Sequence, residues 1–251
     1  TSQTNTTNNT LNPQDIASLV FQSISILSFL AVLIHVSITR WTSPMIQLTT
    51  YDLLPLISTA STTILFIFFI ALGMTVYTRT NDLTQTQCFH SASVLMFFVY
   101  FLLIFMFCTK TSVAYFNYIR FVVLFPPPSP RRLILLLIVS FIIGILCVAL
   151  AAGFHSNPSF RITQLHAGKL CWFSRDAIYY FVTIPVCLFL LLNLISIVFV
   201  TRRIISYVRS GSNADQMHER LKRCVIVLLS SCVTQGVGWL LGPFLSIVNP
   251  G

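Results

Sequence analysis

Charged residues are scarce in this chain. Only 8% of its 251 residues are Asp, Glu, Lys or Arg, whereas about 25% are charged in an ordinary soluble domain. So few charges cannot cover a water-soluble globule of this length with solvated side chains. Hydrophobic residues make up 55% of the chain, and the mean hydropathy is +0.84. The composition therefore excludes an ordinary soluble protein and indicates a membrane protein.

The few charges leave long apolar runs between them. Each run has at least about 20 residues, enough for a helix to cross a hydrocarbon core of roughly 30 Å. The runs are continuously apolar, whereas barrel strands alternate with a period of two. We therefore predict an all-α integral membrane helical bundle at residues 16–248, after a polar extracellular tail at residues 1–15. Its six helices are expected near residues 16–38, 48–76, 89–119, 132–153, 177–201 and 223–247.

Basic residues are divided unequally between the loops. The loops after spans one, three and five hold ten Lys and Arg residues, and the loops after spans two and four hold four. Positive residues accumulate on the cytoplasmic side of membranes, so the N-terminus is expected outside the cell. The same distribution accounts for the net charge of +9 without a nucleic-acid partner. The inner loops include Arg120, Arg131, Arg132, Arg202, Arg203 and Lys222.

Two further features agree with this orientation. The tail contains glycosylation sequons at Asn5 and Asn8, and such sites are modified only on the lumenal side. Cys88 and Cys171 fall at outer ends or loops of the predicted spans, where oxidising conditions permit a disulfide between them. The other five cysteines lie within spans or at a cytoplasmic end, where free thiols pack as small hydrophobes.

Motifs for catalysis and cofactor binding are missing. The five histidines are scattered without the spacing of metal ligands, and the sequence has no Gly-rich phosphate loop and no arguable nucleophile–base pair. His155 and His166 flank the second outer loop, and we expect both to be polar surface residues. We predict that the chain is not an enzyme and holds no cofactor.

The second outer loop and the fifth span carry an ordered series of residues. A Cys-Trp pair is followed by aromatic residues, a proline and an asparagine: Cys171-Trp172-Phe173-Ser174, Tyr179-Tyr180-Phe181, Pro185 and Asn193. Span six contains Cys232-Val233-Thr234-Gln235-Gly236-Val237-Gly238-Trp239 and then Gly242-Pro243. With a cystine at the top of span three, this order resembles the adhesion branch of the secretin-like G-protein-coupled receptors over residues 16–243. The resemblance implies a seven-helix bundle, of which the chain would lack the seventh span.

Polar residues inside the predicted spans include departures from that family. Gln47 stands where the family has a His, and Gln235 stands where it has a Trp in span six. Asp52 and Lys110 are ionisable residues within the apolar runs, and such charges usually face the interior with a partner. Either Asp52 pairs with Lys110, directly or through water, or Lys110 extends to the inner headgroups. Asn193 is a further polar residue inside a span.

The resemblance implies a plasma-membrane receptor that passes a signal from an extracellular agonist to a heterotrimeric G protein. The basic residues of the inner loops would face the G protein, and the lipid would surround the helices. Bending is expected at Gly236, Gly238 and Pro185, and the alternative for the two glycines is close packing of helices through small residues. The agonist pocket is expected at Trp172, Phe173, Phe97, Tyr180, Trp239 and Gln235.

Three other interpretations remain open. Leu48-x-x-x-Asp52 resembles a pattern of the rhodopsin-like G-protein-coupled receptors. A transporter or channel belongs to a different class, although no repeat relates residues 16–119 to residues 132–247. The third interpretation is a non-signalling truncated receptor that dimerises through its helices, favoured by the missing seventh span.

Overall fold

The structure is a computed structural model, and it describes residues 13–42, 50–79, 88, 90–119, 130–155, 163–166 and 170–209. The chain divides into two compact units, residues 1–46 and 47–251, which are described separately. In the first unit, α1 is a 30-residue helix, Pro13–Thr42. Within the part of α1 whose side chains are described, an apolar stretch runs over Ile26–Thr39.

The described part of the second unit contains four long helices, which are α2 (Thr50–Arg79), α3 (His90–Tyr118), α4 (Pro130–His155) and α6 (Ile184–Arg209). A short helix, α5 (Arg175–Ile178), and a π-helix, η2 (Tyr179–Thr183), run directly into α6. Among the residues that the structure describes, four helical segments are long and apolar enough to cross a membrane: Leu53–Thr75, His90–Phe116, Pro130–His155 and Tyr179–Arg202.

These four segments coincide with the second to fifth predicted spans, so the helical bundle is confirmed for this part of the chain. The first predicted span, residues 16–38, lies within α1 but is not among these four segments. The sixth predicted span, residues 223–247, lies outside the described residues.

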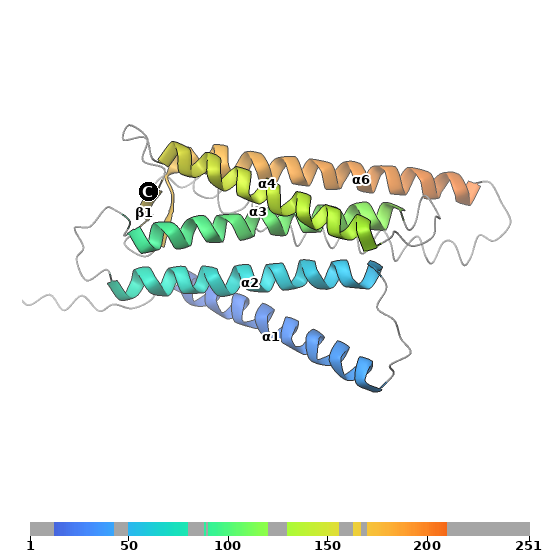
Figure 1. The fold of residues 1–251 in the computed structure, drawn as a ribbon, viewed down its shortest axis with the longest axis horizontal. Coiled ribbons are helices and arrows are strands. Elements are labelled where there is room, and N and C mark those ends of the chain that lie inside the picture. Colours follow the sequence, from blue (N-terminus) through green and yellow to red (C-terminus); the bar gives the residue numbers. More distant parts are fainter. Residues whose placement is uncertain are drawn as a thin grey trace, which may run out of the picture. The chain divides into compact units, whose positions relative to one another are not determined.

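Within the second unit, α3 is the central helix. It packs against α2, α4 and α6 (Figure 1). In its apolar span 67% of the residues are buried, against 17% in the spans of α4 and α6. The outer faces of α4 and α6 are therefore apolar and uncovered, as expected of helices that contact lipid. Among their exposed side chains are Ile138, Ile142, Ile145, Leu188, Leu191 and Ile195.

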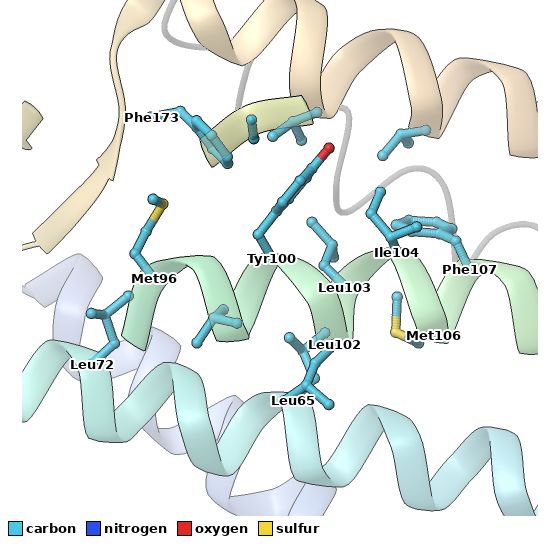
Figure 2. Close-up of a cluster of buried hydrophobic side chains, with 14 of the residues drawn as sticks. Leu65, Leu72, Met96, Tyr100, Leu102, Leu103, Ile104, Met106, Phe107 and Phe173 are labelled. Atoms are coloured by element: carbon cyan, nitrogen blue, oxygen red, sulfur yellow. The ribbon is translucent and has the colours of Figure 1, made fainter. Parts of the chain in front are cut away.

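The core lies on both sides of α3. Leu65 of α2 faces Leu102 of α3, whereas Met96 and Tyr100 point away from α2 (Figure 2). Small hydroxyl residues such as Ser61 are also buried on α2. The Ser61 hydroxyl donates to the carbonyl four residues earlier at 2.8 Å, so this polar group does not enter the core unsatisfied.

A β-hairpin precedes α5. Strand β1 (Thr163–His166) pairs antiparallel with β2 (Leu170–Phe173), with Thr163 opposite Phe173 and Leu165 opposite Cys171. Strand β2 contacts α2, α3 and α5. The hairpin departs from the all-α expectation, because strands of four residues are too short for their periodicity to be distinguished from a loop.

Candidate functional site

A disulfide joins the hairpin to α3. Cys88, two residues before α3 begins, is bonded to Cys171 of β2, and their Cα atoms lie 5.7 Å apart. The disulfide predicted from sequence is thus confirmed. It links positions 83 residues apart and keeps β2 at the end of the bundle where α3 begins.

The residues after Cys171 point alternately to the two faces of β2. Successive strand residues face opposite sides, so Phe173 lies on the same face as Cys171, and both are fully buried. The ring of Phe173 meets Tyr100 of α3 edge-on, with centroids 4.9 Å apart. It also stacks on Phe181 of η2 at 5.7 Å. Phe173 therefore fills the space between α3 and the segment that leads into α6.

Trp172 is half-buried on the opposite face of β2. Its ring meets Phe69 of α2 edge-on at 5.7 Å. Edge-to-face pairs at such distances add to the stabilisation that burial gives. Through two neighbouring residues, the hairpin therefore contacts α2, α3 and η2. We refer to Trp172, Phe173, Tyr100, Phe69 and Phe181 as the aromatic cluster.

Tyr100 makes a polar contact within this cluster. Its hydroxyl donates a hydrogen bond to the backbone carbonyl of Phe181 at 2.7 Å. Tyr100 is only 1% exposed, and burying a hydroxyl without a partner would be costly. Figure 2 shows the Tyr100 ring extending from α3 with Phe173 beside it. The bond ties α3 directly to the backbone of η2.

The predicted pocket residues fall in different environments. Trp172 and Phe173 lie together in the aromatic cluster, whereas Phe97 lies against His155 of α4, with ring centroids 5.6 Å apart. Tyr180 is 70% exposed on the surface of the described bundle, so it does not share a cavity with Phe173 there. Trp239 and Gln235 lie outside the described residues.

His155 differs from the prediction that it is a surface residue. It ends α4, it is only half-exposed, and its buried Nδ1 has no hydrogen-bond partner within the described part of the chain. The sequence could not indicate this burial, because Phe97, whose ring contacts His155, is distant along the chain. Those described residues also contain no group of three or more His, Cys, Asp or Glu side chains that could hold a metal ion.

The polar residues predicted within the spans are only partly described. Asn193 of α6 is 3% exposed, and Lys110 of α3 is half-buried. Gln47 and the side chain of Asp52 lie outside the described residues.

The register between α2 and α3 bears on the possible ion pair. Leu54 of α2 shares a buried cluster with Phe116 of α3, and the two helices run antiparallel (Figure 1). The backbone of Asp52 therefore lies near the level of Phe116. Lys110 precedes Phe116 by six residues, which is about 9 Å along the axis. The pairing stays a prediction, but the register does not favour direct contact.

The predicted hinge and contact residues are distributed as follows. Pro185 is the second residue of α6, directly after η2. Gly236 and Gly238 lie outside the described residues. Arg131, Arg132 and Arg202 are exposed, and α4 begins and α6 ends away from the hairpin (Figure 1). Not described are Arg120, Lys222, the glycosylation residues Asn5 and Asn8, and the side chain of Arg203.

Tyr100, Phe181 and Phe69 complete the cluster but were not candidate site residues on sequence grounds. For Phe181 a signal exists, because Pro185 lies four residues after it and has no backbone N–H to give to its carbonyl. No local signal exists for Tyr100, since it lies 81 residues away.

No protein-family model matches the chain, and no curated protein matches it.

Proposed function

We propose that this chain is the membrane-embedded part of a cell-surface receptor that acts on a heterotrimeric G protein. One observation carries the proposal: a disulfide-tied hairpin inserts aromatic side chains into one end of an apolar helical bundle. This arrangement gives an external ligand a defined structure to act on. The resemblance of the loop and fifth span to adhesion receptors agrees with it.

The hairpin end is proposed to face outward and the basic ends of α4 and α6 to face the cytoplasm. Disulfides persist in oxidising compartments, which favours the outside for Cys88 and Cys171. Basic residues accumulate on the cytoplasmic side, which favours the inside for Arg131 and Arg132. The plasma membrane is the proposed location.

The proposed mechanism begins at Phe173. Its ring contacts both Tyr100 of α3 and Phe181 of η2, so a ligand that displaces β2 acts on α3 and α6 together. Such a ligand shifts the bundle towards an active arrangement only by its difference in affinity for the two states. Separation of the inner ends of α3 and α6 would then admit the G protein beside the exposed Arg202.

Nucleotide exchange tests the function directly. The full chain in lipid nanodiscs is mixed with a purified G protein from each main heterotrimeric class, and GTP-analogue uptake is followed over time. We expect faster uptake than with empty nanodiscs for at least one class. The double variant Arg131→Ala/Arg132→Ala should reduce the acceleration, whereas Arg175→Ala, at the hairpin end, should not.

If the chain accelerates GTP-analogue uptake by no class of G protein, the proposal of a signalling receptor is contradicted. A parallel measurement of solute flux in proteoliposomes addresses the transporter or channel. Flux without nucleotide exchange would favour that class instead.

A further inference from the structure

Pro185 leaves one backbone carbonyl without its usual donor. In an α-helix the N–H of each residue donates to the carbonyl four residues earlier. Pro185 is the second residue of α6 and has no N–H. The carbonyl four residues before it belongs to Phe181, in η2. An α-helical bond to this carbonyl cannot form.

The hydroxyl of Tyr100 donates to that same carbonyl. The O···O distance is 2.7 Å, and the donor belongs to α3. The ring of Phe173 contacts the rings of both partners, Tyr100 and Phe181. The bond satisfies two buried polar groups at once, the phenol of Tyr100 and the carbonyl of Phe181. Each would otherwise carry the desolvation cost of an unpaired buried group.

The helix around Phe181 is wound as a π-helix. The N–H of Ile184 donates to the carbonyl of Tyr179, five residues earlier. Serines and threonines elsewhere in these helices, such as Thr111 and Ser196, donate to the carbonyl four residues earlier. The hydroxyl of Thr183 makes no such bond within the described part of the chain. The π-turn thus rearranges the backbone hydrogen bonds.

This turn determines which face of α6 meets α3. Val186, Asn193 and Val200 are buried at seven-residue intervals, and α6 packs against α3. A π-turn holds one more residue than an α-turn. Rewinding η2 as an α-helix would therefore rotate α6 by about 100° about its axis. Phe199, which is 58% exposed, would then take the place of Val200.

We propose that Tyr100 is a positioning residue that supplies the donor missing at Pro185 and thereby holds the π-turn and the rotational setting of α6. The same hydrogen bond joins the aromatic cluster to α6, so it is a conformational latch within the second unit. The inference concerns the packing of α6 and does not depend on the chain acting on a G protein.

A double-mutant cycle tests the latch. Tyr100→Phe removes only the hydroxyl and keeps the ring against Phe173. We expect it to lower the thermal midpoint in nanodiscs by about 2–4 °C. Pro185→Ala restores a backbone N–H for the Phe181 carbonyl, so Tyr100→Phe should cost less than half as much in that background. Tyr115→Phe on α3, where the tyrosine is 47% exposed, is the matched control and should leave the midpoint unchanged.

Equal shifts in the two backgrounds would overturn the proposal, and so would the absence of a shift with Pro185 present. Hydrogen exchange provides a second measurement if Pro185→Ala fails to fold. Tyr100→Phe should accelerate amide exchange in Tyr179–Thr183 relative to Tyr115→Phe. Unchanged exchange there would also contradict the latch.

The rotational setting is measured separately by alkylation. In a chain in which the exposed Cys187 is replaced by serine, Phe199→Cys should add reactivity towards a lipid-soluble maleimide, whereas Val200→Cys should react no more than the Cys187→Ser chain itself. In the Tyr100→Phe/Pro185→Ala background the cysteine at position 200 should become the more reactive of the two, because the α-turn is then free to form. An unchanged order would refute the link between the latch and the setting of α6.

Discussion

Among single residues, Gly144 shows how closely α4 packs on α3. A Cβ built at Gly144 would come within 2.8 Å of the Phe101 ring. That ring has little freedom to move, because it lies edge-on to Phe141 with centroids 5.3 Å apart and stacks on Phe105 at 6.1 Å. Gly144→Ala should therefore lower stability by about 1–3 kcal/mol through overpacking. Thermal unfolding in nanodiscs measures the change.

Gly153, on the same helix, provides the control. A Cβ there would meet nothing within 4 Å, and alanine is favoured over glycine in a helix by about 1 kcal/mol. Gly153→Ala should leave the midpoint unchanged or raise it. A similar response from both glycines would mean that contact with Phe101 does not limit the residue at 144.

Lys110 is a half-buried charged residue on the central helix, α3. The register places Asp52 about two turns away along the axis, so we expect the two residues to act independently. The losses of surface expression in Asp52→Lys and Lys110→Asp should add in the double variant, as for sites without contact. Restored expression in the double variant would instead establish the ion pair.

Among the elements, the hairpin closes the end of the bundle where α3 begins. Phe173→Ala would remove a fully buried ring that contacts Tyr100 and Phe181. Such a cavity typically costs about 3–5 kcal/mol. Tyr180→Ala, at a residue 70% exposed, should change stability by no more than about 0.5 kcal/mol. Thermal unfolding of both variants in nanodiscs compares their stabilities. Equal losses of stability would contradict a structural role for the buried Phe173 ring.

The long helices were predictable because their apolar runs far exceed the length of an ordinary core helix. Residues 89–119 and 132–153 were expected, and α3 and α4 occupy His90–Tyr118 and Pro130–His155. The hairpin and η2 were not predictable, since each strand of the hairpin has four residues and η2 has five. The disulfide follows from where two cysteines fall, but Tyr100 meets Phe181 only through tertiary packing, which local pattern does not encode.

For the molecule as a whole, the distribution of charge predicts a single orientation in the membrane. The polar tail carries the only two glycosylation sequons of the chain, at Asn5 and Asn8. If the tail is lumenal during synthesis, glycosidase treatment should increase the electrophoretic mobility of the wild-type chain from mammalian cells. The double variant Asn5→Gln/Asn8→Gln should run at the position of the treated protein and should not shift further.

The opposite side can be tested in the same background. Asp215→Thr creates a new sequon at Asn213, in the loop between the fifth and sixth predicted spans. This loop is strongly basic, so we expect it to stay in the cytoplasm and the new site to remain unmodified. Pro158→Ala creates a sequon at Asn157, between α4 and β1. This site lies on the side predicted to be outside, so it is the one expected to be glycosylated. Glycosylation at Asn213 would reverse the orientation and place the disulfide-tied hairpin on the cytoplasmic side, where reducing conditions would break the bond.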